Sequence, residues 1–212
     1  MNDEFTATAV QERGLFSSGY RESAGDAEGP EISELSKRGY HLLKENNISA
    51  AIDQFTKILL VDGENNYALV GMGDAARKQG AYREAAEYYQ RCLDRHPGNN
   101  YALFGLADCY KAMNQYRRAI EIWEQYLLHD DKNITVLTRI ADAYRKIRDF
   151  RRSKSVYHRV LEMDDDNPYA IIGLGHLHYD FREYREALLY WEKMMGLKGG
   201  QVDIRVLTSI GN

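Results

Sequence analysis

The sequence predicts an all-α protein built as a solenoid of antiparallel helix pairs. A segment that begins YALVGMGDAARK at residue 67 returns as YALFGLADCYKA at residue 101, 34 residues later. Related segments, TVLTRIADAYRK and YAIIGLGHLHYD, follow at residues 135 and 169 with the same spacing. Apolar residues inside each copy follow the three-and-four spacing of amphipathic helices. A fixed period of this length is typical of repeat architectures.

Five copies align in one register, with their first positions at Ile32, Asn66, Asn100, Ile134 and Pro168. Apolar residues at positions 4, 7, 8 and 11 of each copy mark the stripe of a first helix, and those at positions 20, 24, 27 and 28 mark the stripe of a second. We therefore expect repeats at 32–65, 66–99, 100–133, 134–167 and 168–203. The expected helix pairs lie near 33–61, 66–95, 100–129, 134–163 and 168–195.

Small and large residues alternate between the two helices of each repeat. Position 8 is Gly or Ala in every copy, and position 20 is Ala or Ser. Position 24 is always a large ring: Phe55, Tyr89, Trp123, Tyr157 and Trp191. Small residues let two helices approach closely, so we expect each ring to fill the space toward the neighbouring repeat.

Asparagine ends four of the five repeats, at Asn65, Asn99, Asn133 and Asn167. Asparagine is a favoured N-cap residue, and Pro168 follows Asn167 where proline is tolerated in the first helical turn. We interpret these asparagines as structural caps of the next first helix.

This pattern resembles the tetratricopeptide repeat family, which has large residues at position 4, small ones at 8, 20 and 27, aromatic ones at 11 and 24, and often proline at 32. The resemblance covers about residues 32–201. It departs from the family at Arg38, which replaces an apolar residue, at position 27, where larger residues stand, and at position 32, where only Pro97 remains. The resemblance implies a right-handed superhelix whose first helices line a concave groove.

In the family, positions 2, 5, 9 and 12 of the first helices point into that groove and hold an extended or helical peptide. Carried onto this sequence, they are Tyr67, Val70, Asp74, Arg77, Tyr101, Phe104, Asp108, Lys111, Thr135, Thr138, Asp142, Arg145, Tyr169, Ile172, His176 and Tyr179. Rigid tyrosines suit a recognition surface because they cover much area at little entropic cost. The alternative is that the tyrosines at position 2 only pack over the preceding turn.

Charge is distributed unevenly along the repeats. Arginine occupies position 18, at the start of the second helix, in four repeats, and a further arginine follows in the fourth; this basic edge comprises Arg83, Arg117, Arg151, Arg152 and Arg185. The helix dipole disfavours cations there. A solvated face with i,i+4 partners such as Glu87 and Glu121 is the simpler interpretation. The lysine, asparagine and arginine set with which some family members bind chaperone carboxylates is missing from any three consecutive repeats, which disfavours a chaperone cofactor.

No catalytic or metal-binding motif stands out. Cys92 and Cys109 lie in helical pattern without a CxxC pair, so we expect buried free thiols. His176 and His178 point about 200° apart on a helix and cannot chelate one metal, and His178 occupies a core position. Asp74, Asp108 and Asp142 each precede a basic residue by three positions, which predicts i,i+3 ion pairs with Arg77, Lys111 and Arg145. We expect no cofactor and no metal.

The two ends differ from the repeats. Residues 1–31 are acidic and poor in apolar side chains, which is typical of a flexible segment, although this segment could also lie along the solenoid and compete with an outside partner. Residues 204–212, IRVLTSIGN, resemble ITVLTRIAD at 134–142 and are interpreted as the start of a sixth repeat or as a capping helix. The first interpretation makes this chain the N-terminal part of a longer protein.

These features favour a non-catalytic scaffold that binds a peptide or helix of a partner protein in a tyrosine-rich groove. The alternative is a regulatory repeat region of a larger enzyme, for example a glycosyltransferase, with catalysis beyond Asn212. RNA binding is disfavoured because the formal net charge is −4. The first residues lack the features of a signal peptide, and no apolar run approaches the length of a membrane span, so we expect a cytoplasmic protein without a membrane partner. The sequence leaves the oligomeric state open.

Overall fold

The computed structural model describes residues 30–197. The chain divides into two units, Met1–Glu34 and Leu35–Asn212. The expectations for the acidic segment and for residues 204–212 lie outside the described residues.

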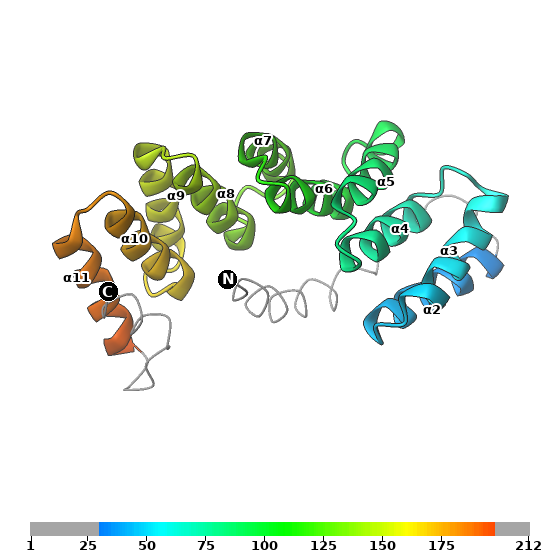
Figure 1. Cartoon of the computed structure of the whole chain (residues 1–212), viewed down its shortest axis with the longest axis horizontal. Coiled ribbons are helices and arrows are strands. Elements are labelled where there is room, and N and C mark those ends of the chain that lie inside the picture. The colour runs from blue at the N-terminus through cyan, green and yellow to red at the C-terminus, as the bar shows by residue number, and fades with distance from the viewer. Residues whose placement is uncertain (1–29, 198–212) are drawn as a thin grey trace. The chain divides into compact units, whose positions relative to one another are not determined.

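Helices form in pairs, as the register of the sequence predicts. The five pairs are α2 (Pro30–Lys44) with α3 (Ile48–Val61), α4 (Asn66–Lys78) with α5 (Tyr82–Arg95), α6 (Asn100–Ala112) with α7 (Tyr116–Leu127), α8 (Ile134–Lys146) with α9 (Phe150–Met163), and α10 (Pro168–Asp180) with α11 (Tyr184–Leu197). The described residues contain no strand. In the last four pairs the two helices pack on each other, and each second helix from α3 to α9 also packs on the first helix of the next repeat, which is the arrangement of an all-α solenoid (Figure 1).

First helices of neighbouring repeats also contact each other directly, α4 with α6 and α8 with α10. We call the side of the solenoid that the first helices form the first-helix face. The residues expected to line the groove, at positions 2, 5, 9 and 12, belong to these helices.

The asparagines at position 34 act as the expected caps. The side-chain oxygens of Asn65, Asn99, Asn133 and Asn167 accept hydrogen bonds from backbone N–H groups two residues into the following helix, at 2.9 to 3.1 Å. The side-chain amides of Asn65, Asn133 and Asn167 also donate to an aspartate three residues earlier. Each cap therefore fixes both the helix start and the turn before it.

The rings at position 24 are packed between consecutive repeats. A Cβ added at Gly73 would come within 2.6 Å of the Tyr89 ring, and one added at Gly105 within 2.3 Å of the same ring. Gly73 is position 8 of the ring's own repeat, and Gly105 is position 6 of the next. Phe55, Tyr89, Trp123 and Tyr157 are fully buried, as expected.

Turns between the helices of a pair use a residue with positive φ at position 15. Only the second repeat supplies glycine there, Gly80; the others place Asn46, Asn114, Arg148 and Arg182 at φ between 58 and 65°. Arginine is poorly suited to this left-handed conformation because its Cβ approaches the backbone.

Both cysteines are buried free thiols, as predicted. Burial raises the pKa of Cys92 to about 11 and that of Cys109 to about 12, so neither thiol is reactive at neutral pH. No helix within residues 30–197 has both the length and the apolar character that a membrane span requires.

Candidate functional site on the first-helix face

Two tyrosines at position 2 are exposed, whereas the other residues of the predicted groove are buried or half-buried. Tyr101 is 37% exposed and Tyr169 is 44% exposed, whereas Tyr67 is half-buried. The backbone carbonyl of Tyr67 accepts a hydrogen bond of 2.9 Å from the Tyr40 hydroxyl. Two exposed rings on α6 and α10 therefore stand at equivalent places, two repeats apart.

The other predicted groove residues form the body of the face beneath these rings. Val70, Asp74 and Thr138 are buried. Half-buried residues are Arg77, Phe104, Asp108, Lys111, Thr135, Asp142, Arg145, Ile172, His176 and Tyr179. Most of the residues predicted to line the groove are therefore only partly accessible to a ligand.

Aspartates at position 9 are held by the tyrosines at position 24 of the same repeat. The Tyr89 hydroxyl donates to Asp74 Oδ1 at 2.6 Å, and the Tyr157 hydroxyl donates to Asp142 Oδ1 at the same distance. Burial and the neighbouring carboxylate raise the pKa of Tyr89 well above its usual value. These hydrogen bonds connect the two helices of one repeat.

Two of the three expected i,i+3 ion pairs are present. Arg77 lies 3.5 Å from Asp74, and Arg145 lies 3.6 Å from Asp142. Arg145 also donates to Asp180 Oδ2 at 2.6 Å, which links α8 to the end of α10. Asp180 occupies position 13, outside the set of positions that the family pattern singles out, and the sequence analysis missed it.

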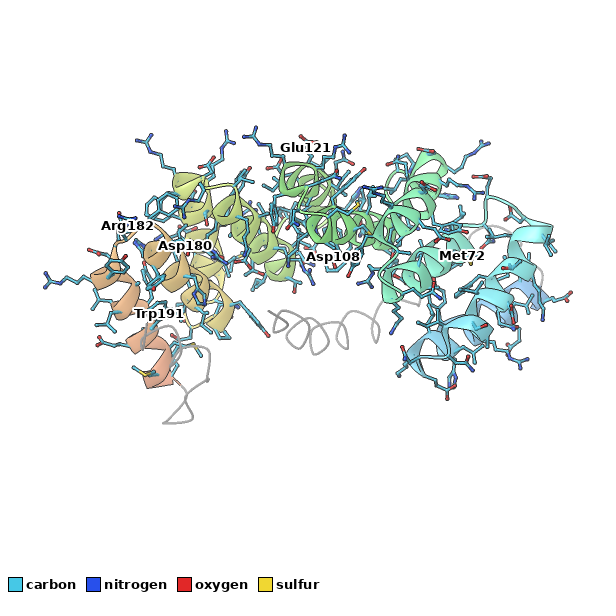
Figure 2. The ribbon with its side chains drawn as sticks, viewed as in Figure 1. Met72, Asp108, Glu121, Asp180, Arg182 and Trp191 are labelled. Atoms are coloured by element: carbon cyan, nitrogen blue, oxygen red, sulfur yellow. The ribbon has the colours of Figure 1, made fainter. Side chains whose placement is uncertain are left out.

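The prediction for Asp108 was wrong. Its partner is Arg139 of the next repeat, whose Nη1 donates to Asp108 Oδ1 at 2.6 Å, rather than Lys111. The two side chains are 9% and 10% exposed, and the Arg139 guanidinium lies 4.8 Å from the centre of the Phe104 ring. The reason is local: position 24 of this repeat is Trp123, which has no hydroxyl to give to Asp108. Figure 2 shows Asp108 on α6 and Asp180 at the end of α10.

The fifth repeat replaces the aspartate of position 9 by His176. Its ring lies 5.7 Å from the Trp191 ring, and Trp191 in turn lies 5.7 Å from Tyr179. Burial, followed by the charge of Arg145, lowers the pKa of His176. This end of the face is aromatic and holds a neutral imidazole at neutral pH.

His178 is a core residue, as expected. It is 2% exposed, its Nδ1 lies 2.5 Å from Glu183 Oε2, and its ring stacks on Tyr190. Among residues 30–197 no group of histidine, cysteine and acidic side chains is arranged to hold a metal ion.

Every arginine of the basic edge is exposed: Arg83, Arg117, Arg151, Arg152 and Arg185. They stand in the first turns of the second helices, away from the first-helix face. Arg152 approaches Asp149 at 3.7 Å with a side chain that is 69% exposed, so this pair is weak.

Comparison with known proteins agrees with this architecture. Models of the tetratricopeptide repeat match residues 36–100 and 138–195, and a second such model matches residues 76–140. A search of curated proteins found no match.

Solved structures share the fold at low identity. A tetratricopeptide repeat protein from Parabacteroides merdae ATCC 43184 is 18% identical over 82% of this chain and 69% of that chain, with a TM-score of 0.74. A MamA fragment, residues 41 to the end, from Desulfovibrio magneticus RS-1 is 16% identical over 84% of this chain and 100% of that chain, with a TM-score of 0.76. Together with the helix pairs, the buried rings and the capped turns, the matching family models show that the chain belongs to the tetratricopeptide repeat family.

Proposed function

We propose that this protein is a non-catalytic scaffold whose first-helix face binds an extended or helical segment of a partner protein. The observation that carries the proposal is the pair of exposed rings, Tyr101 and Tyr169, above an otherwise half-buried face. Tyrosines in such places are frequent binding hot spots because each ring contributes much contact area and one hydroxyl.

The residues beneath these rings support binding by holding the face in one conformation. Hydrogen bonds and ion pairs run from Tyr89 to Asp74, from Asp108 to Arg139 and from Arg145 to Asp180. A surface that is already ordered loses little conformational entropy when a ligand binds. The ligand then bears most of the ordering cost, as expected for a flexible peptide segment.

The proposal can be tested by selecting peptides from a random display library against the full chain. Their dissociation constants would then be measured for the single variants Tyr101→Ala and Tyr169→Ala. Each should weaken binding about tenfold or more, which is the usual effect of losing a hot-spot ring. The matched control is Leu128→Ala, which removes a large side chain that is 84% exposed at the end of α7. Peptides that bind both tyrosine variants with unchanged affinity would refute the proposed site.

A further inference from the structure

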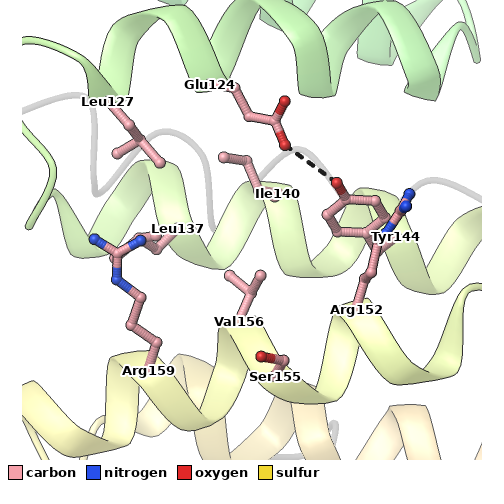
Figure 3. Close-up of a pocket in the computed structure, with 9 residues that line it drawn as sticks. All are labelled: Glu124, Leu127, Leu137, Ile140, Tyr144, Arg152, Ser155, Val156 and Arg159. Carbon is pink, nitrogen blue, oxygen red and sulfur yellow. Dashed lines mark hydrogen bonds between the residues drawn. The ribbon is translucent and has the colours of Figure 1, made fainter.

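A second surface lies on the side of the solenoid formed by the second helices. A cavity of about 230 Å³ opens between α7 and α9, above α8 (Figure 3). Leu137 and Ile140 lie at its base and are nearly fully buried, while Leu127 and Val156 are half-buried along its sides. Arg152, Ser155 and Arg159 of α9, Tyr144 of α8 and Glu124 of α7 complete the lining.

At the cavity the fourth repeat has a smaller residue than the second and fifth repeats have at the same position. Position 23 is Tyr88 in the second repeat and Tyr190 in the fifth, whereas it is Val156 in the fourth, Ile122 in the third and Gln54 in the first. Ser155, beside it, replaces Glu87 and Glu121 of the two preceding repeats. The volume is below the roughly 300–1,000 Å³ of a typical small-molecule site, so it suits one large apolar side chain.

The charge of α9 sets this surface apart from the other described second helices. α9 carries four Lys/Arg and one Glu, a net charge of +3, whereas the basic and acidic residues of α3, α5, α7 and α11 are equal in number. Glu124, the only acidic residue lining the cavity, accepts a hydrogen bond of 3.1 Å from the Tyr144 hydroxyl. Among the residues that line the cavity, two arginines therefore stand against one glutamate.

Both arginines of the lining keep donors for a ligand. Arg159 donates to the backbone carbonyl of Asp131 at 2.6 Å, and its carboxylate contact is 3.7 Å long. Arg152 contacts Asp149 at the same 3.7 Å. A guanidinium has five N–H donors, and 3.7 Å exceeds hydrogen-bond distance, so these contacts leave donors on each side chain.

We infer that this cavity is a docking site for an acidic segment of a partner protein that inserts one aromatic or large aliphatic side chain between Leu127 and Val156. Arg152 and Arg159 are seven residues apart on one helix, which separates their Cα atoms by about 10 Å. In an extended peptide about three residues span that distance. The ligand therefore carries acidic residues three positions apart with the anchor between them. This site is distinct from the first-helix face, and the inference does not depend on the function proposed for that face.

The test uses the full chain and the fluorescein-labelled peptide Gly-Ser-Glu-Ser-Phe-Glu-Ser-Gly, with binding followed by fluorescence anisotropy. Replacing the peptide's phenylalanine by alanine, or both glutamates by lysine, should weaken binding at least about tenfold. Affinity for the acidic peptide should also fall as salt rises, because exposed charges are screened.

Variants of the protein locate the site. Val156→Tyr introduces the side chain that the second and fifth repeats carry at this position. The melting temperature of the variant should be unchanged, and its affinity for the peptide should fall at least about tenfold. Arg152→Glu should weaken binding to a similar degree. Arg118→Glu is its matched control, because Arg118 occupies the same position one repeat earlier and lies 5.7 Å from the Tyr110 ring, as Arg152 lies 5.7 Å from the Tyr144 ring.

Four results would overturn the inference: no saturable binding up to about 1 mM peptide, unchanged binding to a folded Val156→Tyr variant, equal losses for Arg118→Glu and Arg152→Glu, or preferential binding of an oligothymidine, which would assign the surface to nucleic acid. If Tyr101→Ala loses peptide binding and Val156→Tyr keeps it, the peptide binds on the first-helix face, and this site is equally refuted. Retained binding in Tyr101→Ala, with loss in Val156→Tyr, supports the site whether or not the first-helix face binds its own ligand.

Discussion

Replacing Arg139 by glycine should break the buried contact between the third and fourth repeats. Arg139 and Asp108 are 10% and 9% exposed and meet at 2.6 Å. Removing the arginine leaves the Asp108 carboxylate buried without its cation, which typically costs about 3–5 kcal/mol. Glycine within a helix adds about 1 kcal/mol, so the expected loss of unfolding free energy is about 4–6 kcal/mol.

A second substitution should recover part of that loss. Position 6 is glycine in the second, third and fifth repeats, where the ring before it is Phe55, Tyr89 or Tyr157. Combining Arg139→Gly with Trp123→Tyr reproduces the junction around Tyr89, with a hydroxyl placed to donate to Asp108. A hydrogen bond to a charged group contributes about 1.5–3 kcal/mol, so the two changes should be coupled by at least about 1 kcal/mol in the favourable direction.

Urea denaturation followed by far-ultraviolet circular dichroism measures the four members of this double-mutant cycle. Hydrogen exchange of α8 amides should accompany it, because repeat proteins can unfold in parts. Lys57→Gly, at an exposed site in the middle of α3, reports the cost of helical glycine alone. The reasoning fails if Arg139→Gly costs no more than Lys57→Gly, or if the cycle is additive within about 0.5 kcal/mol.

Three further substitutions test other features. Arg182→Gly should raise the unfolding free energy by about 0.5–1 kcal/mol, because glycine tolerates the φ of 65° at this turn. Asn114→Gly should raise it by less. A lower unfolding free energy for Arg182→Gly in thermal or urea denaturation would show that the backbone of Arg182 is not strained. Tyr89→Phe should cost about 1.5–3 kcal/mol in the same assay by removing the hydroxyl that donates to Asp74, while Tyr88→Phe on the same helix should be nearly neutral. Burial and then Arg145 lower the pKa of His176, so this side chain binds its proton less readily in the folded protein, and the unfolding free energy should fall as the pH drops below about 6.5. His176→Gln should reduce the slope of unfolding free energy against pH between pH 7 and 5. An unchanged slope would show that His176 does not titrate in this way.

The sequence predicted the architecture because the repeat pattern depends on residue size and period alone. Rings at position 24, small residues at positions 8 and 20, and asparagine caps appear in nearly every copy, and each takes the place expected for it. The outer bounds of the five helix pairs agree with the structure to within three residues. Agreement of pattern, caps and packing across copies makes such a prediction far stronger than one from any single helix.

Pairing between side chains could not be predicted in the same way. The spacing of Asp108 and Lys111 favours an i,i+3 pair, yet Arg139 from the next repeat reaches the carboxylate instead. That outcome depends on whether the intervening ring carries a hydroxyl, a contact between residues far apart in the sequence. Positions 6, 9 and 24, compared across the copies, do indicate the pairing of Asp108 with Arg139, because arginine appears at position 6 only after tryptophan at position 24.

Another recurring contact was also missed. Arg91, Arg159 and Lys193 all occupy position 26, and each donates to a backbone carbonyl 28 residues earlier, in the loop that precedes its repeat. Gln125 stands at this position in the third repeat. The sequence did not predict this contact, because the partner of the basic residue at position 26 is a main-chain oxygen, which no sequence pattern identifies.

The junction between the third and fourth repeats concentrates the departures from the shared pattern. A repeat in a solenoid contacts only its neighbours, so a residue that serves stacking alone can be the same in every copy. At this junction Arg139 replaces glycine on the first-helix face, while Val156 stands on the opposite side where two other repeats have tyrosine. The arginine is explained by the missing hydroxyl of Trp123, which makes it a matter of stability. Val156 has no such explanation, because it lines a cavity, and a cavity costs contact energy. A cavity retained beside two arginines is better explained by a ligand than by packing, and Val156→Tyr separates the two: packing alone predicts a more stable protein with no function lost, whereas a docking site predicts a stable protein that has lost its partner.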